Sequence, residues 1–222
     1  VWYRYTGKDK EGNSKFKLSK VDPSKIKGVV NIFINGIKND DQNAAKNAMD
    51  KMGTKSGFMI YNPTESFLKD TWQSAVGKNL GQSKASVETA AILSKMQIDH
   101  GKSTIHAHSQ GTIIATNAIR ILAKQSPAWR EHVKGIKAKF WAPAVNKYIA
   151  SGILKRAGAK FNHKRDWKAN PADPVTQVLG MNAFTDGRPW RFGLAIAASP
   201  YMTSTPHSPH SNKGGATKGW TS

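Results

Sequence analysis

A strand, a sharp turn and a helix follow one another directly in the middle of the chain, and this pattern constrains the fold most. Residues 103–107 (STIHA) are typical of a short strand, and the apolar spacing after Gly111 predicts a helix. Ser109 lies in the turn, with the small residues Ala107 and Gly111 two positions before and after it. A turn this sharp accepts only small neighbours and pushes the hydroxyl group out at the end of a sheet. We therefore interpret this segment as a nucleophile elbow.

Strand-like and helix-like runs alternate along the rest of the chain. Strands are predicted at residues 27–34, 57–62, 135–142 and 159–163, and helices at residues 66–80, 86–96 and 147–157 and in the run that ends before Gly53. This alternation predicts an α/β three-layer sandwich, with a mostly parallel sheet and helices on both faces. Residues 1–26 are polar and lysine-rich and are predicted to form a basic arm or edge hairpin, with residues 27–222 as a single catalytic domain.

Polar residues follow three of the predicted strands. Asn35 and Gly36 come after the first strand, Ser109 after the third, and Asp166 and Asp173 after the last. Ligands bind beyond the carboxyl ends of the strands in sheets of this kind. We therefore expect these residues to share one edge of the sheet.

A serine hydroxyl becomes a nucleophile when a histidine accepts its proton and an acid orients that histidine. The partners of a serine in such an elbow follow in the order acid, then histidine. The acidic residues after Ser109 are Glu131, Asp166, Asp173 and Asp186. Asp173 is the predicted acid because prolines on both sides restrict its backbone. Asp166 is the second candidate, although its basic neighbours favour a solvated ion pair.

The predicted base lies in a late loop rich in proline and serine. His210 is preferred there, and His207 is the alternate base. His106 and His108 adjoin the serine, and His108 is expected to line the substrate pocket. No carboxylate near these two histidines completes a ligand set, so neither a metal nor another cofactor is predicted.

Two backbone N–H groups are expected to stabilise the negative charge that develops on the substrate oxygen. One belongs to Gln110, which follows the nucleophile. The other lies near Gly36 or Ile37, in the loop that begins at Asn35.

The formal net charge of +20, with 27 lysines among the 34 basic residues, predicts an anionic partner. A phospholipid surface, a nucleic-acid backbone and an acidic protein all satisfy this condition. The longest apolar runs, residues 28–37 and 192–198, are too short to span a bilayer. Because the chain begins at Val1, we expect a mature product or a domain cut from a longer polypeptide.

The elbow Ala107-His108-Ser109-Gln110-Gly111 resembles that of the α/β-hydrolase superfamily of lipases, esterases and thioesterases. By this resemblance Ser109 is the nucleophile, Asp173 the acid and His210 or His207 the base. The chain also resembles lipase-like toxin domains at the C-terminal ends of bacterial polymorphic toxins, through VNIFINGIKN (30–39), IYNPT (60–64) and SPHS (208–211). This second resemblance implies a protein that is secreted or delivered into a target cell, and an acidic immunity protein as its partner.

Three functions follow from these observations. The first is a serine esterase or lipase that hydrolyses a membrane phospholipid as an antibacterial effector. The second is a hydrolase of acyl or aminoacyl esters on an acidic carrier, such as RNA or acyl carrier protein. The third is a non-catalytic nucleic-acid-binding module on a hydrolase fold, indicated by tryptophans beside basic residues at Trp129, Trp167 and Trp190.

Overall fold

The structure of the protein is a computed structural model. It describes residues 2–6, 19–20, 30–35, 51–52, 56–60, 83–170, 173, 175–180, 182 and 187–191. Its strands are β1 (Trp2–Thr6), β2 (Ser19–Lys20), β3 (Val30–Ile34), β4 (Ser56–Ile60), β5 (Ser103–His108), β6 (Ile136–Trp141) and β7 (Trp167–Lys168). The helices are α3 (Lys84–His100), α4 (Gly111–Gln125), α5 (Pro127–Val133) and α6 (Lys147–Ala157), followed by a π-helical turn at Val175–Leu179.

One sheet of seven strands, in the order β2-β1-β4-β3-β5-β6-β7, organises the molecule. The five strands from β4 to β7 in this order are parallel to one another. At the other edge, β1 pairs antiparallel with both β4 and β2. The nucleophile strand predicted from the sequence, β5, is therefore central, between β3 and β6.

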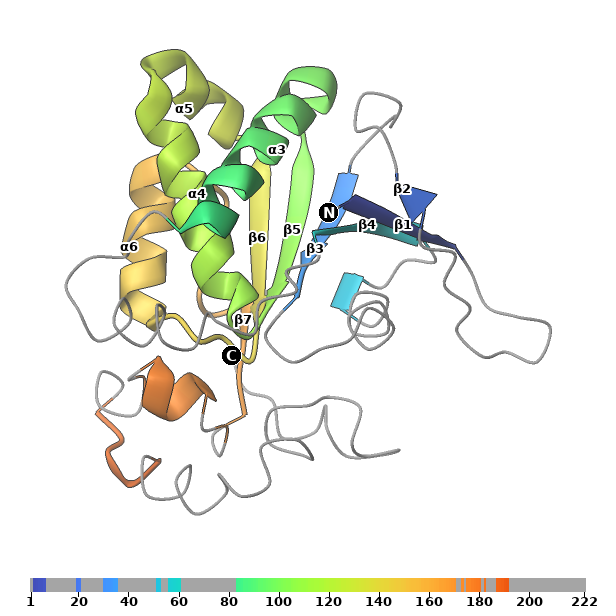
Figure 1. Ribbon diagram of the computed structural model, residues 1–222. Coiled ribbons are helices and arrows are strands. Elements are labelled where there is room, and N and C mark those ends of the chain that lie inside the picture. Colours follow the sequence, from blue (N-terminus) through green and yellow to red (C-terminus); the bar gives the residue numbers. More distant parts are fainter. Residues whose placement is uncertain are drawn as a thin grey trace.

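The helices α3, α4, α5 and α6 lie together against β5 and β6, as Figure 1 shows, and α4 contacts each of the other three. The strands turn an apolar row toward this layer: Ile32, Ile105 and Ala138 are in register and fully buried. Along α4 every residue from Gly111 to Ile119 is buried, because this helix packs against the sheet and against its neighbouring helices. These residues form the main hydrophobic core.

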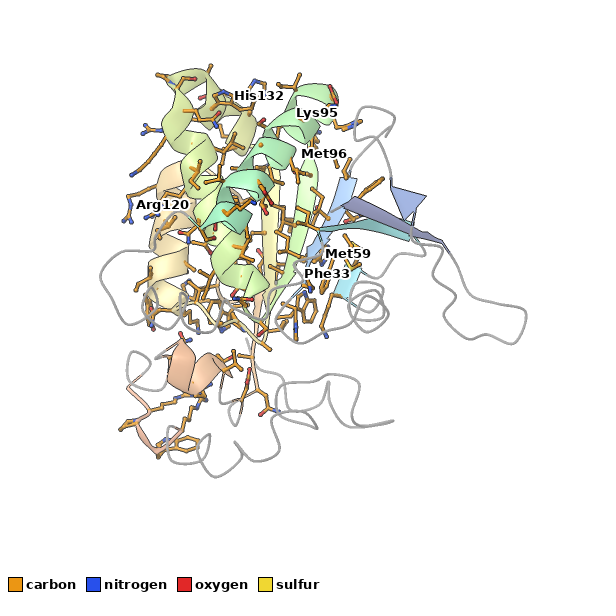
Figure 2. The ribbon with its side chains drawn as sticks, in the orientation of Figure 1. Phe33, Met59, Lys95, Met96, Arg120 and His132 are labelled. Carbon is orange, nitrogen blue, oxygen red and sulfur yellow. The ribbon has the colours of Figure 1, made fainter. Side chains whose placement is uncertain are left out.

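The opposite face of the sheet has a different character. Phe33 of β3 and Met59 of β4 are paired and fully buried on this face, and both are labelled in Figure 2. The helical residues Lys51 and Met52 are buried as well, and the Lys51 ammonium group lies 4.9 Å from the centre of the Trp141 ring. The helical residues Lys51 and Met52 therefore lie near this face, at the carboxyl end of β6.

Most predicted elements that fall on described residues are confirmed, and α6 has the predicted bounds. The strand predicted at residues 159–163 is wrong. Only Lys160 forms a bridge there, with Lys137, and the paired strand is β7. Turn chemistry explains the difference. The Asn162 side chain accepts a hydrogen bond from Lys164 N, and the Asn162 backbone N–H donates to the Asp166 carboxylate.

Helix α5 was not predicted, although Ser126 caps it and Pro127 opens it. The predicted helix at residues 66–80 and the apolar run at residues 192–198 lie outside the described residues. No helix in the described ranges is long and apolar enough to cross a membrane.

Candidate functional site

Ser109 follows the last residue of β5 and adopts a left-handed backbone conformation, with φ 54°. This region costs energy for a residue with a Cβ atom and is rare outside glycine and asparagine. The chain then enters α4 at Gly111. The strand, the strained serine and the helix are thus arranged as the sequence predicted for a sharp elbow.

Hydrogen bonds hold the strained backbone of Ser109 on both sides. Its N–H donates to the Trp141 carbonyl at 3.0 Å. Its carbonyl accepts from Thr112 N at 3.0 Å, from Thr112 Oγ1 at 2.6 Å and from Ala144 N at 3.3 Å. A strained backbone conformation persists when several surrounding contacts fix it, and residues in such conformations cluster at functional sites.

Gly111 explains why the position two residues after the serine is small. A Cβ atom there would collide with the Ile34 carbonyl and would lie 2.7 Å from the Asn35 carbonyl oxygen. The end of β3 therefore packs directly against the start of α4. This contact brings Asn35, which is fully buried, next to the elbow as the sequence predicted.

The loop after β6 adjoins the elbow and contains a second strained residue. Ala142 has φ 42°, and its N–H donates to the Lys168 carbonyl at 2.8 Å. Thr112 Oγ1 also accepts from Ala144 N at 3.2 Å, so α4 and this loop share one threonine hydroxyl. Two left-handed residues other than glycine thus lie at the carboxyl edge of the parallel strands.

The serine and its neighbours are enclosed. Ser109 keeps 5% of its surface exposed, and His108 and Gln110 are buried. Charges and dipoles act more strongly in such an enclosed position than in water.

Asp173 is fully buried and its carboxylate is held by its own turn. Oδ1 accepts from Val175 N at 3.0 Å, and Oδ2 accepts from Thr176 Oγ1 at 2.6 Å. The residue follows β7, so the parallel direction of that strand carries it toward the edge at which Ser109 lies. Its neighbours on both sides, residues 172 and 174, lie outside the described residues.

Asp166 precedes β7, so the expectation that it follows the last strand is wrong. Its oxygens accept from Arg165 Nε and Nη2, both at 3.0 Å, and from Asn162 N at 3.0 Å. Burial would raise the pKa of this carboxyl, but these hydrogen bonds and the charges of Arg165 and Lys137 lower it below its usual value. The predicted ion pair with a basic neighbour is present, but it is not fully solvated, because the Asp166 side chain is buried and only Arg165 is exposed.

The segment after Asp173 contacts the same loop that contacts Ser109. Asn146 Nδ2 donates to the Gly180 carbonyl at 3.0 Å, and Lys147 N donates to Asn182 Oδ1 at 2.8 Å. Asn182 Nδ2 also donates to the Val145 carbonyl at 3.3 Å. Asp173 and Ser109 are therefore connected through residues 175–180, Asn182 and the loop at 142–146.

His106 and His108 point to the face of β5 opposite the helix layer. Burial and the charges of Lys139 and Lys137 lower the pKa of His106 to about 4, although a hydrogen bond with the Lys51 backbone partly opposes this shift. His106 is therefore neutral at pH 7. No cluster of three histidine or carboxylate side chains that could hold a metal occurs within the described ranges.

Four predicted site residues, Gly36, Ile37, His207 and His210, lie outside the described residues. Thr112 and the loop at residues 142–146 were not predicted as parts of the site. The hydroxyl of Thr112 meets a residue 32 positions away, and no local sequence pattern marks such a pair.

No protein-family model matches the chain, and no curated protein has a significantly similar sequence.

Proposed function

We propose that the protein is a serine-dependent carboxylic-ester hydrolase of the lipase or phospholipase type, with an α/β-hydrolase-like three-layer fold. The left-handed backbone of Ser109 at the end of the central strand β5 carries the proposal. Residues other than glycine seldom adopt this conformation, and a nucleophile elbow requires it to present the hydroxyl.

Gln110 N–H and an N–H of the loop after β3 would stabilise the oxyanion when the Ser109 hydroxyl attacks the ester carbonyl. Two positions support this arrangement. Gln110 directly follows the serine, and the packing of Gly111 on the Asn35 carbonyl brings the start of the loop to the elbow. In our proposal Gly36 or Ile37 supplies the second N–H, and His108 lines the pocket.

Asp173 serves as the acid and His210, or alternatively His207, as the base in the proposed triad. Asp173 is preferred to Asp166 for two reasons. It follows β7 instead of preceding it, and the Asp166 carboxylate is already engaged in an ion pair with Arg165. The histidine would accept the serine proton and then donate it to the leaving alcohol.

A membrane phospholipid is the proposed substrate class. The net charge of +20 concentrates the enzyme on an anionic bilayer. Delivery into a target bacterial cell and inhibition by an acidic immunity protein belong to the same proposal, because the sequence resembles toxin domains.

A fluorophosphonate probe followed by mass spectrometry tests the nucleophile, because it modifies only an activated serine. The probe should label Ser109 in the wild type and label nothing in Ser109→Ala. Ser94→Ala is the matched control, since Ser94 lies on the surface of α3 and donates to the Ala91 carbonyl at 2.9 Å. Labelling of another serine, or equal hydrolysis of short esters by wild type and Ser109→Ala, would refute the proposal.

Asn substitutions distinguish the two acids. Asp173→Asn should lower kcat by about 10³-fold to 10⁴-fold, because the histidine loses the acid that orients it. Asp166→Asn should leave kcat nearly unchanged. The reverse order of effects would assign the role to Asp166.

Substrate assays separate the remaining alternatives. Turnover of acyl-RNA or acyl carrier protein without turnover of phospholipid vesicles would favour an acidic carrier as the substrate. The nucleic-acid-binding alternative loses part of its support, because Trp167 is buried against Phe140 and Trp129 packs against His132, with ring centroids 6.3 Å and 5.0 Å apart respectively. The buried Trp167 cannot stack on bases.

A further inference from the structure

Three large hydrophobic side chains are exposed beyond the carboxyl edge of the sheet. Tyr148 and Ile149, in the first turn of α6, are 51% and 52% exposed, and Trp190 is 62% exposed. Single exposed hydrophobics are ordinary, but exposed groups gathered at one end of a molecule mark an interaction surface. We call Tyr148, Ile149 and Trp190 the edge face.

Hydrogen bonds connect the start of α6 to the elbow. Helix α6 begins directly after the loop whose Ala144 N–H donates to the Ser109 carbonyl. Gly180 and Asn182 lie against the start of α6, and Figure 1 shows the described residues 175–180 and 187–191 beyond the lower end of β6. The edge face and Ser109 therefore belong to the same end of the molecule.

Basic side chains accompany the edge face. Lys147 precedes Tyr148, whose ring lies 6.2 Å from that of His163, next to the exposed Lys164. The Arg191 guanidinium lies 5.5 Å from the centre of the Trp190 ring, but Arg191 is buried, so Lys147 and Lys164 are the cations that lipid phosphates can reach. In the described residues that follow Glu131, no acidic side chain is exposed, because Asp166 and Asp173 are both buried.

We propose that the edge face docks the protein on an anionic phospholipid bilayer, with Tyr148, Ile149 and Trp190 entering the headgroup region and the neighbouring cations contacting lipid phosphates. This inference rests on the proposed function for its purpose, since docking at this end brings Ser109 toward its substrate. Tyrosine and tryptophan prefer the membrane interface, and lysine and arginine bind anionic headgroups. A second copy of this chain fits less well, because each copy carries a net charge of +20.

Vesicle co-sedimentation tests the proposal without requiring catalysis. The full chain with Ser109→Ala is mixed with phosphatidylcholine vesicles that contain or lack phosphatidylglycerol. Adding Tyr148→Gln and Ile149→Gln should weaken binding to the anionic vesicles by about tenfold or more, since two apolar side chains no longer leave water. Trp190→Ala should weaken it similarly.

Ile98→Gln is the matched control. Ile98 is 62% exposed near the C-terminal end of α3. The chain passes from this end of the helix into the amino end of β5. This variant should bind as tightly as its parent. With Ser109 intact, the edge-face variants should hydrolyse short soluble esters at the parental rate, which separates docking from chemistry.

Three results would overturn the docking proposal. The first is that the edge-face variants bind as well as the parent, and the second is that Ile98→Gln binds as weakly as they do. The third is that vesicles without phosphatidylglycerol bind the protein equally well. A wild-type dimer that the edge-face variants dissociate would assign the face to self-association instead. If Ser109 does not react with the fluorophosphonate, each of these binding results can still be interpreted, because the binding assay uses the Ser109→Ala chain and requires no catalysis.

Discussion

At the scale of single residues, Thr112 connects the elbow to the loop after β6. Its hydroxyl donates to the Ser109 carbonyl at 2.6 Å and accepts from Ala144 N at 3.2 Å. Both bonds are buried, so their loss leaves polar backbone groups without compensation. We infer that Thr112 is a positioning residue, which acts on the proposed nucleophile Ser109 through the backbone of that serine.

Thr112→Val should lower the free energy of unfolding by about 1–3 kcal/mol, because a buried hydroxyl that serves two backbone groups is lost. It should also slow the labelling of Ser109 by a fluorophosphonate about tenfold, whereas Thr112→Ser should restore most of the rate. Urea denaturation and the time course of labelling measure the two effects.

Thr116→Val supplies the matched control for this prediction. Thr116 is buried one turn later in α4, and its hydroxyl donates to the Thr112 carbonyl at 2.7 Å. Its loss should reduce stability but leave the labelling rate of the folded protein unchanged. Equal slowing in both variants would mean that Thr112 has only a general structural role.

At the scale of the elements, strand β5 has two different faces. Ile105 and Ala107 contribute to the core beneath α4, whereas His106 is buried on the opposite face in register with Phe33 and Lys139. A neutral histidine fits this position, because burial and the nearby lysines oppose its protonation.

The buried His106 should make folding depend on pH in a definite direction. Its pKa is about 4 in the folded protein and about 6.5 when the chain is unfolded. Between these values the unfolded state binds the additional proton, so stability falls as the pH drops from 6.5 toward 4. The contribution is fully present above pH 6.5.

This group should make the wild type about 2 kcal/mol less stable at pH 5 than at pH 7. Urea denaturation at both pH values measures the total change in the wild type and in His106→Gln. The variant should show a loss smaller by about this amount, because glutamine does not titrate. The same pH dependence in both proteins would contradict the low pKa.

Local sequence signals, such as helix caps, correctly predicted the elements that contain them. They failed where a strand forms only because it pairs with another strand. Helix α6 was predictable because Asn146 caps its first turn and Gly158 ends it. The run at residues 159–163 contains apolar residues at alternating positions, yet Asn162 and Asp166 fold it into a turn. Strand β7, with only two residues, pairs at the end of β6 and has no local pattern of its own.

At the scale of the whole molecule, much of the predicted edge is present among the described residues. Ser109 and Asn35 lie at one edge because parallel strands deliver their carboxyl ends to one side, which alternating strands and helices predict, and Gly111 packs on the Asn35 carbonyl there. Asp173 follows β7 on the same side. The role of Thr112 was beyond prediction, since it depends on which loops touch after folding.

The net charge of +20 leads to the last prediction, which concerns the entire surface. Long-range attraction to an anionic bilayer weakens as salt shortens the Debye length from about 10 Å at 0.1 M to about 3 Å at 1 M. A neutral soluble ester has no such attraction to lose. Hydrolysis of anionic vesicles should therefore fall at least about tenfold over this range, while hydrolysis of the soluble ester changes less than about twofold.

The comparison of the two substrates separates surface charge from the chemistry proposed at Ser109, because both proposed reactions would use this nucleophile. Vesicles of phosphatidylcholine alone provide the control, since they lack the anionic charge that attracts the protein. If salt slows all three reactions equally, it acts on the fold or on the site itself. The excess of lysine would then have no part in bringing the protein to its substrate.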